Sequence, residues 1–210
     1  MPIRRRSLLA LLAASESLSR VAQAQQSPSS GAPTLERLTS PRTLGRPDAA
    51  IKVTEFFSLT CTHCAAFQRG TFPQVKAQLI DPGKLELIYH DFPLDKVALM
   101  AAMVARALTP ERYEPFITAL FATQDRWAFA RNITPADELE KLALLAGMSH
   151  ETFQATIAND QLRQFILQES EQAEAQYHVD STPTFLCNGK THAGELSYDA
   201  FAKFVTQAAG

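Results

Sequence analysis

The sequence is short of cysteine, glycine and tryptophan, with three, eight and one in 210 residues. Three cysteines are too few for the disulfide framework of a small secreted scaffold, and a chain of this length can bury a full core without one. Charge of one sign is also lacking, because 20 Lys and Arg face 22 Asp and Glu. With no basic stripe, this balance argues against nucleic acid as a partner. No repeat appears, and no run after residue 24 is long and apolar enough to cross a membrane.

Positive charge is concentrated at the N-terminus, where residues 4–6 are all arginine and precede the apolar stretch 8–14. Residues 22–24 read Ala-Gln-Ala, a small-x-small cleavage pattern, so residues 1–24 are expected to be an export signal peptide. Two of the arginines could belong to a twin-arginine signal. No serine or threonine precedes the pair, which favours the Sec route. Export would place the protein in the periplasm, where disulfides form and persist.

Residues 25–37 are rich in Ser, Pro and Gly and are expected to form a disordered leader. Periodicity and turn residues then predict strand, helix, strand, a block of helices, a hairpin and a final helix. The expected ranges are an edge strand within 34–47, a strand at 51–57, a helix from the cysteine motif to 69 that resumes after a break and ends at 80, a strand at 85–92, helices between 95 and 178, a hairpin at 182–193 and a helix at 198–207. This order predicts an α/β domain of residues 38–94 and 179–210, with an all-helical domain, residues 95–178, inserted in it.

Cys61 and Cys64 are separated by Thr62 and His63 and follow an apolar run. Covalent haem attachment would need a histidine after the second cysteine, and an alanine stands there instead. A zinc site needs about four ligands, usually from two paired clusters, whereas the other histidines and Cys187 are scattered singly. A structural disulfide closing so small a loop would constrain the unfolded chain very little. The residues therefore favour a redox-active pair.

A redox role has a physical basis if Cys61 ends a loop and opens a helix. Its sulfur then faces unpaired backbone N–H groups and the positive end of the helix dipole, and both favour thiolate over thiol. His63 could add a positive charge or an N–H donor beside that sulfur. Stabilising the thiolate stabilises the reduced form and makes the disulfide a better oxidant. Cys64, one turn inside the helix, is expected to be shielded and to resolve the mixed disulfide that Cys61 forms.

Glu55 is anomalous because it occupies the inward phase of the predicted strand 51–57, between Val53 and Phe57. A buried carboxylate is costly unless it is paired or protonated. One interpretation is a slipped or edge strand that leaves Glu55 in solvent. The functional interpretation is a buried proton acceptor below the disulfide, with a raised pKa, that serves the resolving thiol.

These motifs together resemble the DsbA-like family of thioredoxin-fold thiol:disulfide oxidoreductases. Residues 55–64, Glu-Phe-Phe-Ser-Leu-Thr-Cys-Thr-His-Cys, are similar to the family's acid–aromatic–aromatic–Ser–x–x–Cys-x-His-Cys signature. Thr-Pro-Thr-Phe at 182–185, followed by Asn-Gly-Lys, looks like its cis-proline loop and hairpin, and the resemblance covers residues 38–208. It implies a thioredoxin fold with an inserted helical domain. It also implies that Pro183 is cis and abuts the disulfide, and that the Thr182 backbone pairs with bound substrate.

The resemblance implies an exported dithiol oxidase that passes the Cys61–Cys64 disulfide to reduced or misoxidised exported proteins. Re-oxidation by a DsbB-like membrane quinone reductase is expected, with no cofactor, no metal and a monomeric protein. The best-known oxidants of this family have proline where Thr62 stands and valine where Thr182 stands. Threonine before the cis-proline also occurs in isomerase and reductase relatives. A reductase or isomerase fed by a DsbD-like partner therefore stays open.

A different class also stays open, namely a peptide-binding or metal-binding protein whose cysteines are incidental. The third cysteine, Cys187, lies four residues after Pro183 and shares the phase of Phe185 in the predicted strand. It is therefore expected to be a buried inert thiol rather than a third redox partner.

Overall fold

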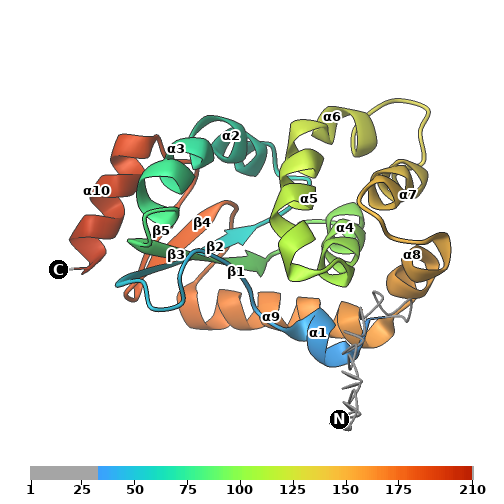
Figure 1. Cartoon of the computed structure of the whole chain (residues 1–210), viewed down its shortest axis with the longest axis horizontal. Helices are drawn as coiled ribbons and strands as arrows, with labels where there is room; N and C mark the ends of the chain where they lie inside the picture. The colour runs from blue at the N-terminus through green and yellow to red at the C-terminus, as the bar shows by residue number, and fades with distance from the viewer. Residues whose placement is uncertain (1–32, 210) are drawn as a thin grey trace, which may run out of the picture. The chain divides into compact units, whose positions relative to one another are not determined.

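The structure, a computed structural model, describes residues 33–209, so the predicted signal peptide at 1–24 lies outside the described residues. Its centre is a five-stranded sheet in the order β1-β3-β2-β4-β5 (Figure 1). The strands are β1 (Arg42–Leu44), β2 (Ile51–Phe57), β3 (Leu85–Asp91), β4 (Thr184–Cys187) and β5 (Lys190–Ala193). β2 and β3 are parallel, and the other neighbouring pairs are antiparallel. A mixed sheet of this order is the thioredoxin fold that the sequence predicts.

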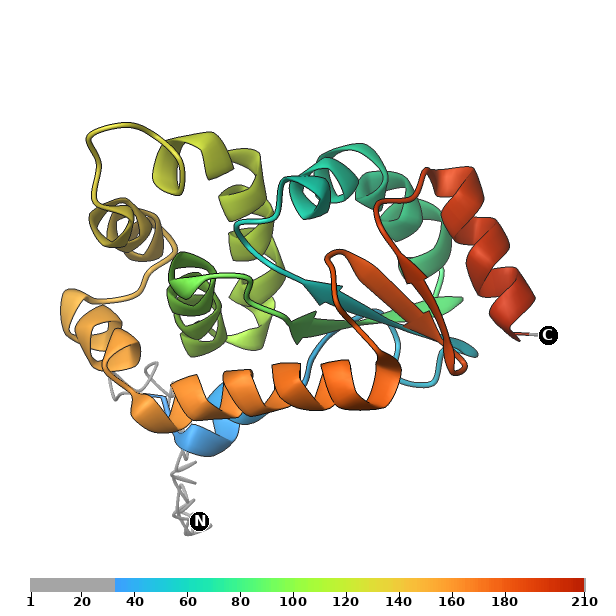
Figure 2. The ribbon, with the colours of Figure 1, turned by 180° about the vertical axis from the view of Figure 1, so that it is seen from behind.

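Helices cover both faces of the sheet and one end of it. They are α1 (Leu35–Thr39), α2 (Thr62–Gly70), α3 (Phe72–Val75), the π-helical turn η1 (Lys76–Ile80), α4 (Lys96–Ala107), α5 (Pro110–Ala122), α6 (Gln124–Trp127), α7 (Pro135–Leu145), α8 (His150–Ile157), α9 (Asp160–Tyr177) and α10 (Tyr198–Ala209). α2, α3 and α10 lie on one side of the sheet and α9 on the other (Figures 1 and 2). None of the helices between residues 33 and 209 is long and apolar enough to cross a membrane.

Strand β2 shows how the two faces are filled. Successive side chains of a strand point to opposite faces, and here both faces are buried. Phe57 belongs to the main core, with its ring centroid 6.0 Å from that of Phe121 in α5. Phe56 points the other way and packs with Ala173 and Tyr177 of α9. Long helix α9 therefore belongs partly to the helical block and partly to the cover of the sheet.

Most predicted elements are present, and the one clear difference lies at the leader. The edge strand, the broken helix, the hairpin turn at Asn188-Gly189 and the final helix are all confirmed. The leader predicted at 25–37, however, ends too late, because α1 begins at Leu35 and Thr34 caps it. Leu38 is buried in the core, and Arg37 donates a hydrogen bond to the Ala107 carbonyl at 3.0 Å. These contacts order a segment that composition alone assigns to the leader.

Two buried arginines join the sheet to the helical block. Arg106 of α4 forms an ion pair with Asp91 at the end of β3, and both side chains are buried. Arg42 of β1 donates to the Arg106 carbonyl oxygen at 2.7 Å, and Arg106 donates to the Leu38 carbonyl at 3.2 Å. α1, β1, β3 and α4 are thus held by one buried polar network. The boundaries between the α/β domain and the inserted domain, at 94/95 and 178/179, stay a prediction.

Candidate active site

Cys61 lies at the N-terminus of α2, as the sequence predicts. Its backbone is extended (φ −76°, ψ 122°), and its sulfur accepts a hydrogen bond from the Cys64 backbone N–H at 3.3 Å. A tight turn after β2 delivers it there, closed by a bond from Cys61 N–H to the Ser58 carbonyl at 3.0 Å. The sulfur therefore faces the unpaired N–H groups and the positive end of the helix dipole.

The environment of Cys61 favours its thiolate. The pKa of this thiol is lowered from 9.0 to about 5. The largest cause is a hydrogen bond from the Cys64 side chain; burial opposes it, and the Thr182 side chain and the backbone N–H groups of Cys64 and His63 lower the pKa further. Cys61 is 8% exposed. It combines the reactive ionisation state with a small exposed area, which Cys64 lacks.

Cys64 is the chemical opposite of Cys61. It is fully buried one turn into α2. Its pKa is raised, first by burial, then by its hydrogen bond to Cys61 and by the negative charges of Cys61 and Glu55. Both residues are free thiols in the structure. One cysteine of the pair is thus poised as a thiolate and the other as a protonated thiol.

Glu55 is buried, which confirms the inward phase read from the strand. It is 2% exposed and lies in register between Tyr89 of β3 and Phe185 of β4. One carboxyl oxygen has no hydrogen-bond partner. Burial, followed by the negative charge of Cys61, raises the pKa of Glu55 to about 8. The carboxyl is therefore able to hold or release a proton near neutral pH.

The second half of the site comes from the loop before β4. The Thr182–Pro183 peptide bond is cis, as the resemblance implied. The Cys61 thiol donates to the Thr182 carbonyl oxygen at 3.1 Å, so this loop lies directly against the reactive sulfur. Thr182 is buried, and its hydroxyl has no hydrogen-bond partner while Cys61 is a thiol bonded to the Thr182 carbonyl, so this hydroxyl is free to stabilise the thiolate. Substrate binding by Thr182 and Pro183 stays a prediction.

The two residues inside the motif, Thr62 and His63, are exposed. The His63 imidazole does not bond to the Cys61 sulfur; its Nδ1 lies 3.2 Å from a carboxylate oxygen of Glu195. The part of His63 that acts on the sulfur is its backbone N–H. The tuning role predicted for the imidazole is therefore not a direct contact in this conformation.

Two polar contacts that the sequence analysis missed fix the loop before Cys61. Gln124 of α6 donates to the carbonyl oxygens of Leu59 at 2.8 Å and Cys61 at 3.1 Å. Thr60 donates to the Asp95 carboxylate at 2.6 Å, and Asp95 also caps α4. Both partners come from the helical block. They lie 35 and more than 60 residues away along the chain, so no local pattern could reveal them.

The third cysteine, Cys187, lies outside the redox site. Cys187 is buried in β4, as predicted, and burial raises the pKa of its thiol. Within residues 33–209, no group of three or more His, Cys, Asp or Glu side chains is arranged to hold a metal ion. The described residues thus supply no built site for the metal-binding alternative.

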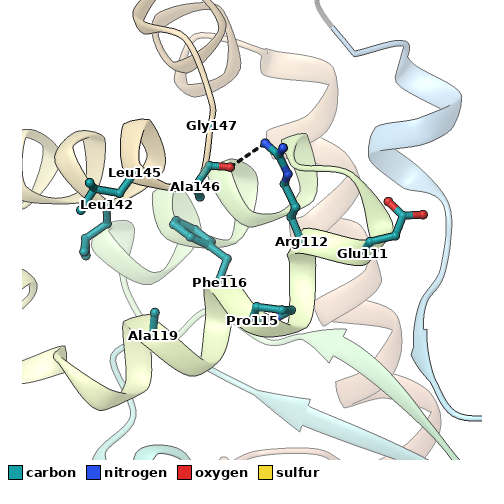
Figure 3. A pocket seen from close by; sticks show the side chains of 9 residues that line it. All are labelled: Glu111, Arg112, Pro115, Phe116, Ala119, Leu142, Leu145, Ala146 and Gly147. Carbon is teal, nitrogen blue, oxygen red and sulfur yellow. Dashed lines mark hydrogen bonds between the residues drawn. The ribbon is translucent and has the colours of Figure 1, made fainter. Parts of the chain in front are cut away.

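Two of the grooves that residues 33–209 form lie largely on the helical block. One, of about 490 Å³, runs between α5 and α7, where Arg112 donates to the Ala146 carbonyl at 2.8 Å (Figure 3). It contains none of the predicted site residues. The other, of about 600 Å³, is lined partly by Asp95, Met100 and Met103. Because Asp95 is bonded to Thr60, this second groove lies beside the loop that carries Cys61.

Comparisons with known proteins agree with this geometry. A family model described as thioredoxin matches residues 38–207. A relative from Rickettsia conorii named a protein-disulfide oxidoreductase is 27% identical over 166 residues, 79% of this chain and 59% of the relative. The chain thus spans about three fifths of the length of the curated relatives it matches. Among solved structures, alpha-DsbA1 of Wolbachia pipientis is 28% identical with a TM-score of 0.75, covering 85% of this chain and 94% of that one. A protein-disulfide isomerase from Novosphingobium aromaticivorans is 25% identical with a TM-score of 0.68, covering 81% and 97%.

Proposed function

This chain belongs to the thioredoxin family and, within it, to the DsbA-like proteins, and on that premise we propose that it is an exported thiol:disulfide oxidoreductase acting as a dithiol oxidase. One observation carries the proposal: the Cys61 sulfur lies at the N-terminus of α2 and accepts the Cys64 N–H at 3.3 Å, while Cys64 is fully buried, so the Cys61 pKa is lowered and the Cys64 pKa is raised. A stabilised thiolate favours the reduced form of the pair, and the oxidised form then tends to give its disulfide away.

The exchange proceeds in two steps. A substrate thiolate attacks the Cys61 sulfur of the disulfide; the Cys61–Cys64 bond breaks, a mixed disulfide forms, and Cys64 leaves as a thiolate that takes up a proton. A second substrate thiolate then attacks the substrate sulfur of the mixed disulfide, and Cys61 leaves as a thiolate. Two electrons pass from the substrate to the cysteine pair. Because the Cys61 thiolate is the better leaving group, the second step favours release of an oxidised substrate.

Glu55 supplies the proton that the first step needs. Cys64 is fully buried and its thiolate is strongly disfavoured. Glu55 is buried near enough for its charge to raise the Cys64 pKa, and it is itself protonated over much of the neutral range because its pKa is about 8. It therefore gives a proton to Cys64 during substrate oxidation and takes one back when the disulfide is restored.

Substrates are polypeptides with reduced or wrongly paired cysteines. The Thr182 backbone and Pro183 hold the substrate segment beside Cys61, and Thr62 and His63 form the exposed surface that it meets. Unfolded segments expose apolar side chains, and the groove beside Asp95 presents the partly buried side chain of Met100, whose flexibility suits varied partners.

The decisive measurement is the equilibrium of the cysteine pair with glutathione. An oxidase is expected to have a potential well above the roughly −270 mV of thioredoxin, and the oxidised protein should convert a reduced substrate protein to its disulfide form. A Cys61→Ser variant is the matched control for both assays. A thioredoxin-like potential, with efficient reduction of insulin, would instead support the reductase or isomerase alternative, to which the Novosphingobium relative's name points.

Location and partners belong to the same proposal. Residues 1–24 direct export, by Sec rather than the twin-arginine route, to the periplasm, where a DsbB-like quinone reductase re-oxidises a monomeric protein. DsbA-like relatives are typically periplasmic. Export is tested by the N-terminus of the protein recovered from the periplasm, which should be Gln25. Recovery of the uncut chain from the cytoplasm alone would contradict it.

A further inference from the structure

Residues 194–196, in the short connection between β5 and α10, touch three separate parts of the redox site. The Gly194 N–H donates to the Pro183 carbonyl at 2.7 Å. The Glu195 carboxylate lies 3.2 Å from His63 Nδ1. The Leu196 carbonyl accepts a hydrogen bond from the Thr71 hydroxyl, at the end of α2, at 2.6 Å. One three-residue segment thus joins the cis-proline loop, the cysteine motif and the far end of α2.

These anchors fix Glu195 although its side chain is exposed. Gly194 has a φ of +98°, which few residues other than glycine adopt, and this turns the chain toward the cysteine motif. Leu196 is 8% exposed and belongs to the main core. The backbone on both sides of Glu195 is therefore held, and the carboxylate is delivered to His63 by the fold rather than by a free surface side chain.

The His63 imidazole is bonded to one anion and lies two residues along the chain from a second. The first is the Glu195 carboxylate. The second is the Cys61 thiolate, whose stabilising contacts come from Cys64, Thr182 and the backbone N–H groups of Cys64 and His63, not from the imidazole. A ring whose Nδ1 is bonded to the carboxylate is not free to turn toward the sulfur. The two anions therefore compete for one imidazole ring.

We infer that Glu195 is a positioning residue that restrains the His63 imidazole and thereby limits how strongly oxidising the Cys61–Cys64 disulfide is. In the disulfide state no thiolate exists, and Glu195 is the anion that His63 meets. In the reduced state the thiolate competes with it. Without Glu195 the imidazole ring is free to turn toward the thiolate, so the reduced form gains stability relative to the oxidised form. The inference rests on the redox activity of the cysteine pair but not on the direction of electron flow.

The test is the glutathione equilibrium constant of the Glu195→Gln variant against the wild-type protein. Exposed ion pairs are worth about 0.2–1 kcal/mol, so the equilibrium is expected to shift roughly 1.4- to fivefold toward the reduced form. That shift corresponds to about 4 to 20 mV, since tenfold is ~30 mV for two electrons. The Cys61 pKa should fall at the same time, and Glu195→Asp should change both quantities less than Glu195→Gln does.

Two further variants separate this role from a merely structural one. In a His63→Ala background, Glu195→Gln should leave the equilibrium unchanged, because the residue acts through the imidazole. Asp199→Asn, which removes an exposed carboxylate four residues away on α10, should also leave it unchanged. An unshifted Glu195→Gln protein, or an equal shift in the His63→Ala background, would overturn the inference. A wild-type potential like that of thioredoxin would overturn the oxidase proposal, yet the comparison between variants would still stand.

Discussion

The sulfur of Cys61 lies 3.1 Å from the carbonyl oxygen of Thr182, although 121 positions separate the two residues. A carbonyl oxygen accepts a bond from a thiol but offers nothing to a thiolate, which has no proton to donate. The Cys61 thiolate must therefore be held by other groups, namely the Cys64 thiol, the Thr182 side chain and the N–H groups of α2. Ionisation thus frees the Thr182 carbonyl oxygen, which belongs to the backbone segment proposed to pair with a substrate.

The first prediction concerns the acidity of Cys61. Alkylation of the reduced protein by iodoacetamide should follow a thiolate with a pKa of about 5. A Cys64→Ala variant should raise that pKa by about 1, because it removes the largest stabilising hydrogen bond and a bond to a charged group is worth ~1.5 kcal/mol. Both proteins should carry Cys187→Ala, so that Cys61 is the reactive thiol whose alkylation is measured. An unchanged pKa in Cys64→Ala would show that the helix N-terminus acts alone.

The second prediction is that reduction stabilises the fold at neutral pH. The pKa of Cys61 is about 5 in the folded reduced protein and near 9 when unfolded, so the unfolded chain binds more protons between these values. Stability from this group is therefore present at high pH and is lost as pH falls through 5. At pH 7 the free energy of unfolding, measured in urea, should be about 2 kcal/mol larger for the reduced form than for the oxidised form. A more stable oxidised form at pH 7 would contradict this.

The third prediction concerns Glu55 in the oxidised protein, where no thiolate titrates. Burial, the larger of the two causes that raise the pKa of Glu55 above 4.5 in the reduced protein, acts in the oxidised protein as well, so above pH 4.5 the native state binds more protons than the unfolded state. Stability should therefore fall as pH rises from 4.5 toward the raised pKa, by roughly 1.4 kcal/mol for each unit of the rise in pKa. A Glu55→Gln variant should lose that slope, while Glu171→Gln, at an exposed position of α9, should keep it. Parallel wild-type and Glu55→Gln profiles would place Glu55 in solvent.

The fourth prediction concerns the buried pair Asp91–Arg106. An Arg106→Met variant leaves the Asp91 carboxylate buried without its partner, which should lower the free energy of unfolding by about 3–5 kcal/mol. Adding Asp91→Asn should recover part of that loss. Lys141→Met, which breaks an exposed pair with Glu138, is the matched control and should cost less than ~0.5 kcal/mol. Equal effects at the two pairs would argue against a buried network.

The sequence predicts those parts of the site that depend on local order. Alternation in β2 places Glu55 inward, because a buried strand fixes which residues face the core. A loop followed by a helix places Cys61 at the helix start and Cys64 one turn inside, since this follows from helix geometry alone. The fold class follows from the order of strands and helices along the chain, because that order limits how the elements can be layered around one core.

The sequence does not predict the polar contacts between distant segments. Gln124, Asp95 and Glu195 all bond to the loop or motif around the cysteines, yet each is a polar residue with no periodic signal. The orientation of His63 depends on Glu195, which lies 132 positions away. Arg42 and Arg106 are buried although charged residues are ordinarily found at the surface. Such positions become visible only when tertiary structure brings their partners together.

Gln124 of α6 makes the backbone of the cysteine loop dependent on the helical block. Its amide donates to the carbonyl oxygens of Leu59 and Cys61. The Cys61 carbonyl also accepts the Ala65 N–H, so the Leu59 carbonyl is the acceptor that depends on Gln124, and a buried acceptor left without a donor costs about 1–3 kcal/mol. The cysteine loop therefore depends on the helical block. If it were grafted onto a minimal thioredoxin without α6, it would lose the Gln124 amide that holds its backbone. Among related sequences, a change in the backbone of that loop should therefore be accompanied by a change at the position of Gln124 in α6.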